Sequence, residues 1–216
     1  MIPEEPVRFG APGGPTLDGA LAHPPGATGG VVVCHPHPLY GGDMDNPVVL
    51  ALRLACRDAG LAVLRFDFRG VRRSAGIHGA GVGEQDDVRA ALDLLEDRLR
   101  KTPALAGYSF GAAMAAAVAA AGRPLAGLAL VAPPGATVIP AASYPVLVAA
   151  GSDDHVCSSA TLAAWRAALP GGSVHVIPGG DHFFSGGLAP LRTGLAAWTA
   201  RVSAAGAAAS RCPPTG

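Results

Sequence analysis

Charged side chains are scarce in this sequence, and the two signs cancel. Asp, Glu, Lys and Arg make up 15% of the 216 residues, with 16 of each sign, so the formal net charge is zero. Proteins that bind nucleic acid or adsorb to an anionic membrane rely on a basic surface. The composition therefore indicates neither nucleic acid nor a membrane as a partner.

Membrane-spanning and secretory segments are also missing. No apolar run approaches the roughly 20 residues that cross a bilayer. The first residues, M-I-P-E-E-P, have neither the basic start nor the apolar stretch of a secretory signal. The four cysteines share no spacing typical of a metal site or a disulfide framework. We therefore expect a cytoplasmic protein with reduced thiols and without a metal or cofactor.

What the sequence does have is a regular alternation of apolar runs and helical segments. Strands are predicted at residues 31–34, 61–66, 104–108, 125–131, 146–150 and 174–177, and helices at 46–59, 84–100, 112–121, 158–169 and 188–202. Apolar runs separated by helices are typical of parallel strands buried on both faces. The pattern predicts an α/β fold with a mostly parallel central sheet and helices on both faces. We expect one domain over residues 1–202 and a disordered tail over 203–216.

The pentapeptide G-Y-S-F-G at residues 107–111 is the motif that carries chemistry. Glycine is abundant, with 30 residues, so the pattern alone is weak, but it lies between a predicted strand and an Ala-rich helix. That context is the one required of a nucleophile elbow, a sharp turn that lifts a serine hydroxyl into an open pocket. Glycines at both ends avoid crowding between the strand and the helix. We predict that Ser109 is a nucleophile.

A serine nucleophile needs a base, and the base needs a third group to orient it. In an open sheet these partners follow the carboxyl ends of later strands, where the sequence reads G-S-D-D-H-V at 151–156 and G-G-D-H-F-F at 179–184. We predict that His182 is the base, because it alone of the seven histidines follows the last strand in a glycine-rich loop. Asp154 is favoured over Asp153 as the acid, and Asp181 is interpreted as a turn residue.

Two N–H groups should stabilise the oxyanion that forms during acyl transfer. The amide of Phe110, directly after the nucleophile, is the first. The second should come from the loop that follows residues 31–34 and reads H-P-H-P-L-Y-G-G at 35–42. Its prolines cannot donate, so His37 is the first available donor, with Leu39 or Tyr40 as the fallback.

Two further groups of residues have competing interpretations. His35 and His37 are close in sequence, but no third ligand stands at metal-site spacing, so we interpret His35 as a brace for the loop. Four arginines cluster at residues 65–73 around Asp67. They could attract an anionic substrate, but we favour a solvated loop with an internal pair between Asp67 and Arg69.

These motifs resemble the α/β-hydrolase superfamily, and within it the small lidless bacterial serine esterases related to dienelactone hydrolases. The likeness rests on four blocks in order, C-H-P-H-P-L-Y-G-G-D-M-D-N at 34–46, F-D-F-R-G-V-R-R-S-A-G at 66–76, G-Y-S-F-G at 107–111 and G-D-H-F-F at 180–184. The resemblance implies a triad of Ser109, Asp154 and His182, with the amides of Phe110 and His37 as the oxyanion hole. Arg72 stands where this branch usually has glycine, and serine stands where true dienelactone hydrolases have cysteine.

The expected reaction is hydrolysis of a small-molecule ester through an acyl-enzyme, with a thioesterase, an amidase or a non-catalytic binding module as alternatives. Residues 132–144, where lids usually insert in this fold, number only 13 and are too short for a helical cap. An open site favours short acyl groups. Tyr40, Phe110, Phe183 and Phe184 could form a small apolar acyl pocket, and packing in the core is the alternative for at least half of them. We assign Tyr40 and Phe183 to the pocket. The sequence leaves the oligomeric state open.

Overall fold

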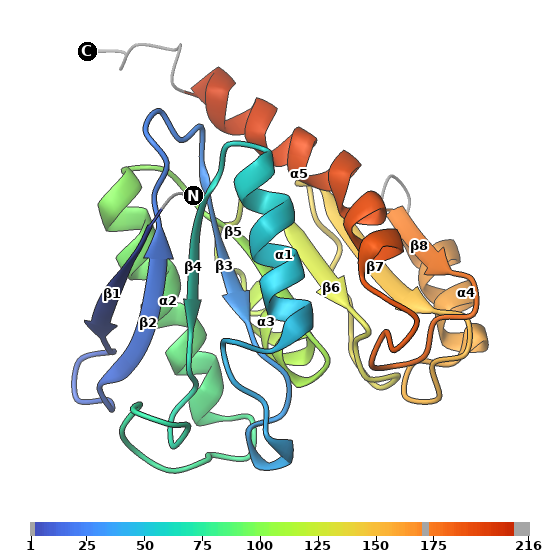
Figure 1. Ribbon diagram of the computed structural model, residues 1–216, viewed down its shortest axis with the longest axis horizontal. Coiled ribbons are helices and arrows are strands. Elements are labelled where there is room, and N and C mark those ends of the chain that lie inside the picture. The colour runs from blue at the N-terminus through green and yellow to red at the C-terminus, as the bar shows by residue number, and fades with distance from the viewer. Residues whose placement is uncertain (1–2, 170–172, 210–216) are drawn as a thin grey trace.

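An eight-stranded sheet with the order β1-β2-β4-β3-β5-β6-β7-β8 forms the centre of the computed structural model, which describes residues 3–169 and 173–209 (Figure 1). The strands are β1 (Glu4–Phe9), β2 (Leu17–Ala22), β3 (Gly30–Cys34), β4 (Ala62–Phe66), β5 (Ala104–Tyr108), β6 (Leu128–Val131), β7 (Val146–Gly151) and β8 (Ser173–Ile177). β2 runs antiparallel to β1 and β4, and all other neighbours are parallel. The prediction of a mostly parallel sheet is confirmed.

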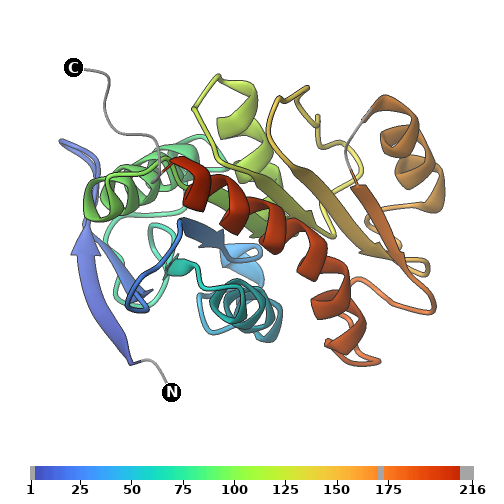
Figure 2. The ribbon, with the colours of Figure 1, turned by 90° about the horizontal axis from the view of Figure 1, so that it is seen from above.

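Helices cover both faces of this sheet, as Figure 2 shows from above. They are α1 (Pro47–Asp58), α2 (Gly83–Leu99), α3 (Phe110–Ala120), α4 (Ser159–Ala168) and α5 (Ala189–Ala209), with a 3₁₀ turn η1 (Pro38–Tyr40). α1 and α5 pack on one face, and α2, α3 and α4 pack on the other. Among the described residues, no helix is long and apolar enough to cross a membrane.

The central strands are apolar throughout because both of their faces are buried. In β3 every residue is buried; Val32 packs into the core under α2 and α3, and Val31 and Val33 pack into the core under α1 and α5. Successive side chains of a strand point to opposite faces, so a strand between two helical layers needs apolar residues at every position. This is why the continuous apolar runs of the sequence predict parallel strands.

The C-terminal helix is longer than predicted. α5 continues through residue 209, so residues 203–209 are helical and the prediction of disorder from 203 onward is wrong. Ser203 Oγ lies 2.8 Å from Thr28 Oγ1, and a Cβ on Gly206 would lie 2.2 Å from the Thr28 carbonyl oxygen. Contact with the distant Thr28 loop and an Ala-rich sequence account for the extension. The rest of the predicted tail, 210–216, lies outside the described residues.

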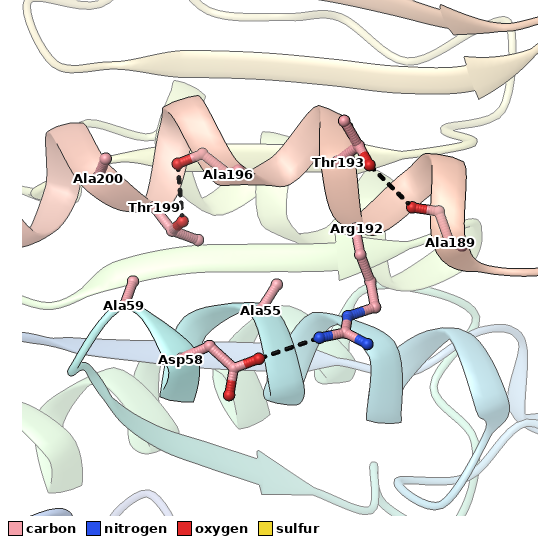
Figure 3. Close-up of a pocket in the computed structure, with 9 residues that line it drawn as sticks. All are labelled: Ala55, Asp58, Ala59, Ala189, Arg192, Thr193, Ala196, Thr199 and Ala200. Atoms are coloured by element: carbon pink, nitrogen blue, oxygen red, sulfur yellow. Dashed lines mark hydrogen bonds and ion pairs between the residues drawn. The ribbon is translucent and has the colours of Figure 1, made fainter.

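Small side chains of α1 and α5 leave a groove of about 530 Å³ between these helices (Figure 3). One ion pair bridges it, with Arg192 Nη2 lying 3.0 Å from Asp58 Oδ2. The hydroxyls of Thr193 and Thr199 donate to carbonyl oxygens of their own helix. The polar side chains of this groove are thus engaged with one another or with the helix backbone, and no Ser, Cys or His is among the residues that line it.

Candidate active site

The G-Y-S-F-G motif forms a sharp turn between β5 and α3. Ser109 has φ of 53° and ψ of −116°, a conformation that L-residues rarely adopt and that lifts its side chain out of the turn. A Cβ on Gly107 would lie 2.3 Å from the Gly111 carbonyl oxygen. A Cβ on Gly111 would lie 2.4 Å from the carbonyl oxygen of Cys34 at the end of β3. Both glycines are required for the close approach of helix and strand that the sequence indicates.

Ser109, His182 and Asp154 form a continuous hydrogen-bonded chain. Ser109 Oγ lies 3.0 Å from His182 Nε2, and His182 Nδ1 lies 2.9 Å from Asp154 Oδ2. Asp154 follows β7 and His182 follows β8, so loops from neighbouring strands meet above the elbow. Because an ionised carboxylate can only accept a hydrogen bond, Nδ1 carries the ring proton, and Nε2 is left as the acceptor for the serine hydroxyl. The structure brings together all three residues predicted for the triad.

Asp154 is held in one orientation by the backbone. It is 3% exposed, and its Oδ1 accepts hydrogen bonds from the amides of Val156 at 2.7 Å and Cys157 at 2.9 Å. Burial alone raises the pKa of this carboxyl, but the hydrogen bonds from His182 and the two amides outweigh it and hold the pKa below its usual range. A charged, aligned carboxylate therefore faces His182.

The two competing carboxylates have other contacts. Asp153 is exposed, and its Oδ1 accepts from Ser152 Oγ at 2.8 Å. Asp181 Oδ1 accepts from the amide of Ser185 at 2.9 Å, which matches its interpretation as a turn residue. The geometry thus places Asp154, rather than either neighbour, against His182.

The two residues whose amides are predicted to form the oxyanion hole, His37 and Phe110, line the same cavity as Ser109. Leu39 N–H donates to His37 Nδ1 at 3.2 Å and Tyr40 N–H donates to the His37 carbonyl oxygen at 3.1 Å, so both fallback donors are engaged. Within the described residues, the N–H groups of His37 and of Phe110, the first residue of α3, have no acceptor. The His37 and Phe110 rings lie 4.8 Å apart between centroids.

His35 braces the loop, as predicted. It is fully buried, and its Nε2 accepts a hydrogen bond from the amide of Phe68 at 3.0 Å while Nδ1 lies 2.6 Å from the Pro36 carbonyl oxygen. Burial lowers the pKa of His35 to about 4, so the ring is neutral. Among residues 3–169 and 173–209, no three His, Cys, Asp or Glu side chains are gathered as a metal ion would require.

The arginine cluster is paired differently from the prediction. Arg69 does not pair with Asp67; its Nη2 lies 2.7 Å from Oδ1 of the buried Asp87 on α2, which also accepts from the Arg69 amide. Asp67 instead accepts from the Met44 amide at 2.8 Å. The remaining arginines pair with carboxylates: Arg65 with Glu4 and Asp45, Arg72 with Asp45, and Arg73 with Asp18. Most of these partners are distant in sequence, and Arg65 and Arg72 both hold Asp45 in the loop over residues 43–46. Arg72 Nε also lies 3.8 Å from Asp67 Oδ2.

Ser109 opens into an uncharged cavity of about 530 Å³. Tyr40 and Phe183, the residues predicted for the pocket, line it together with Phe110. Phe184 does not, because it is 4% exposed and packs in the core under α5. No Asp, Glu, Lys or Arg side chain belongs to the lining. Residues 132–145 contain neither helix nor strand, so this segment provides no helical cover.

Two further residues contribute to the site without having been predicted. The hydroxyl of Tyr108 donates to the carbonyl oxygen of His182 at 3.0 Å and so ties the base to the elbow. Asn46 lines the cavity, and its Oδ1 caps α1 by accepting from the amide of Val48 at 2.9 Å. Tyr108 occupies the variable position of the motif before the serine, where only its size and hydroxyl could have indicated a role.

Comparison with solved structures places the chain in a family. An alpha-beta serine hydrolase homologue from Coxiella burnetii is 34% identical, with a TM-score of 0.81 over 91% of this chain and 98% of that one. The chain belongs to the α/β serine hydrolases. The hydrolase is also 32% identical to an a/b serine hydrolase without lid from Xanthomonas campestris, with a TM-score of 0.79 over 92% and 96% of the two chains.

Two other matches are weaker, one because its sequence identity is low and one because it covers only part of the chain. An esterase from Pyrococcus furiosus is 16% identical to the hydrolase, with a TM-score of 0.76 over 92% of this chain and 94% of that one. An uncharacterised curated protein of Rickettsia prowazekii is 46% identical over 83 residues, which are 38% of this chain and 35% of the relative. No protein-family model matches the chain.

Proposed function

We propose that the hydrolase cleaves short-chain carboxylic esters through an acyl-enzyme on Ser109. The observation that carries the proposal is the hydrogen-bonded chain from Ser109 through His182 to Asp154 at the mouth of an uncharged cavity. Nucleophile, base and orienting acid stand in the order that acyl transfer needs.

In the proposed reaction, His182 Nε2 accepts the Ser109 hydroxyl proton as Oγ bonds to the ester carbonyl carbon. The carbonyl oxygen becomes an oxyanion, which accepts hydrogen bonds from the amides of His37 and Phe110. The C–O bond to the alcohol then breaks, and the imidazolium donates its proton to the leaving oxygen. Water, deprotonated by the same nitrogen, then attacks the acyl carbon. The bond from this carbon to Oγ breaks, the imidazolium returns its proton to Ser109 Oγ, and the acid is released. Asp154 stabilises the imidazolium in both halves.

The surroundings of Ser109 favour a neutral substrate with a short acyl group. A cavity without charged side chains offers no counter-ion for an ionised substrate, and the aromatic rings of Tyr40, Phe110 and Phe183 provide apolar contact. With no helical cover from residues 132–145, little surface is available to enclose a long acyl chain.

Hydrolysis of p-nitrophenyl acetate, butyrate, octanoate and palmitate by the purified protein and by Ser109→Ala tests the proposal. We expect turnover that falls as the acyl chain lengthens and disappears in the variant. Equal rates in both proteins would contradict a role for Ser109.

The type of acyl bond is tested separately with butyryl thioester and butyryl amide at matched concentrations. A higher kcat/KM on the thioester or the amide than on the oxyester would replace the proposed substrate class. A folded protein that neither hydrolyses any of these nor reacts with a fluorophosphonate at Ser109 would be a binding module rather than an esterase.

A further inference from the structure

The large apolar side chains that this protein exposes are concentrated at one end of the sheet. Among the described residues they are Leu39, Tyr40, Ile77, Val82, Val138, Val156 and Phe183, which we call the apolar rim. All seven lie in segments that leave the carboxyl ends of β3, β4, β6, β7 and β8, and the segments after β3 and β4 lie at the lower edge of Figure 1. Single exposed apolar residues are ordinary, but their restriction to the end of the sheet that carries Ser109, Asp154 and His182 is not.

The rim is continuous with the cavity that holds Ser109. Tyr40, Val156 and Phe183 line that cavity directly. Leu39 and Ile77 line an adjoining hollow of about 390 Å³. The two hollows share the loop over residues 38–42, and the rings of His37 and His78 meet there with centroids 5.2 Å apart. Apolar surface therefore extends from outside the molecule to the reacting serine.

The stretches that carry the rim residues are uncharged, and charged residues such as Arg73, Asp153 and Asp181 border them. No Asp, Glu, Lys or Arg occurs in residues 35–42, 74–83, 124–152, 155–165 or 182–191. Three charged side chains, Asp43, Arg69 and Arg72, line the adjoining hollow. Arg69 is paired with Asp87, and Arg72 is paired with Asp45 and lies 3.9 Å from Asp43. Burial and the neighbouring His78 lower the pKa of His37, which favours its neutral form. A face of this kind suits a neutral apolar partner rather than an ionic one.

We propose that the apolar rim docks on the surface of a neutral, water-insoluble ester, such as a droplet of short-chain glyceride, and that the substrate passes from there to Ser109 without entering bulk water. The inference rests on the proposed esterase activity and specifies how its substrate is presented. Removal of exposed apolar side chains from water drives the docking, and charge plays no part in it. A second copy of the chain is the competing occupant of the same surface.

Partition of the full-length Ser109→Ala variant into tributyrin droplets tests the docking without consuming the ester. Protein left in the aqueous phase after centrifugation is measured against droplet area. On this background, Ile77→Ser/Val82→Ser changes two rim residues that are 82% and 75% exposed, outside the cavity that holds the triad. We expect the rim variant to bind at least about tenfold more weakly, because two apolar side chains are lost from the docking surface. The matched control, Ala163→Ser/Ala164→Ser on the exposed side of α4, should bind like its parent.

Activity on a dissolved ester and partition into droplets are measured separately, so failure of this inference can be distinguished from failure of the proposed function. With Ser109 intact, the rim variant should hydrolyse dissolved p-nitrophenyl acetate at the wild-type rate but lose activity on tributyrin droplets. Hydrolysis of the dissolved ester without partition into droplets, or equal partition of rim and control variants, would overturn the docking and leave the esterase proposal standing. A dimer in sedimentation velocity that the rim variant converts to a monomer would assign the surface to a second copy and overturn the docking as well.

Discussion

Replacement of Asp154 by asparagine should turn the imidazole of His182 into the wrong tautomer. The amides of Val156 and Cys157 both donate to Oδ1, so the oxygen of an asparagine is held at that position. Its NH₂ group then occupies the place of Oδ2, 2.9 Å from His182 Nδ1. A donor facing Nδ1 makes that nitrogen the acceptor and moves the imidazole proton to Nε2, where it faces Ser109. The base then has no lone pair for the serine proton.

The expected loss of kcat is large because the carboxylate has two functions, and the asparagine performs neither. It no longer holds His182 in the correct tautomer, and it no longer stabilises the imidazolium. In a serine protease triad, the same exchange lowers kcat about 10⁴-fold. At about 1.4 kcal/mol for each factor of ten, this corresponds to roughly 5 kcal/mol of transition-state stabilisation. Asparagine has almost the same shape as aspartate and keeps both amide hydrogen bonds. The midpoint of thermal unfolding should therefore change by only a few degrees.

The assay is steady-state hydrolysis of p-nitrophenyl butyrate, with Asp153→Asn as the matched control. Asp153 is exposed and accepts from Ser152, so its variant should keep kcat within about twofold, in line with surface substitutions of about 0.5 kcal/mol. A kcat for Asp154→Asn within tenfold of the wild type, or an equal loss in both variants, would refute the assignment of the acid.

Two predictions concern stability. Gly111→Ala places a methyl group 2.4 Å from the Cys34 carbonyl oxygen, so we expect a loss of about 1–3 kcal/mol, seen as a lower thermal midpoint together with reduced kcat. Gly186→Ala, with no atom within 4 Å of the added methyl, should leave both unchanged. The second prediction concerns Asp67, whose pKa is raised to about 6 by burial. The native state then binds this proton more tightly than the unfolded state, so the carboxyl costs stability as pH rises from about 4 to 6. Relative to Asp67→Asn, the wild type should lose up to about 3 kcal/mol over that range in urea unfolding. A difference that is independent of pH would contradict the raised pKa.

The elbow and the sheet could be predicted from the sequence because their determinants are local. Val31, Val32 and Val33 are apolar since both faces of β3 are covered, and Gly107 and Gly111 are needed where α3 approaches β3 and β5. The apolar runs form a repeated pattern, and Gly107 meets Gly111 only four positions away, so both can be recognised in the sequence. The approach of Gly111 to Cys34 is long-range and is recognised only because Gly111 belongs to the motif.

The choice between Asp153 and Asp154 depends on how two distant loops meet. The Asp153 amide donates to the carbonyl oxygen of Gly180, and a Cβ on Gly151 would lie 1.8 Å from the same oxygen. This tight junction of the loops after β7 and β8 turns residue 154 toward His182. The sequence shows two adjacent carboxylates but not the junction that distinguishes them.

Ion pairs were the least predictable feature. The partner of Arg69 is Asp87, one helix further along the chain, and Arg65 pairs with Glu4 on the edge strand. Neighbours in sequence, such as Asp67 and Arg69, are the natural first choice when topology is unknown. In the same way, the contact between Ser203 and Thr28 that accompanies the extension of α5 joins opposite ends of the chain.

Trapping the acyl-enzyme tests directly whether Ser109 is the nucleophile. Wild-type protein is mixed with p-nitrophenyl butyrate, quenched in acid within milliseconds, digested and examined by mass spectrometry. We expect one butyryl group on the peptide that contains Ser109, which disappears as the substrate is exhausted and never forms in Ser109→Ala. Ester turnover with no acylated peptide, or with the butyryl group on another side chain, would contradict Ser109 as the nucleophile.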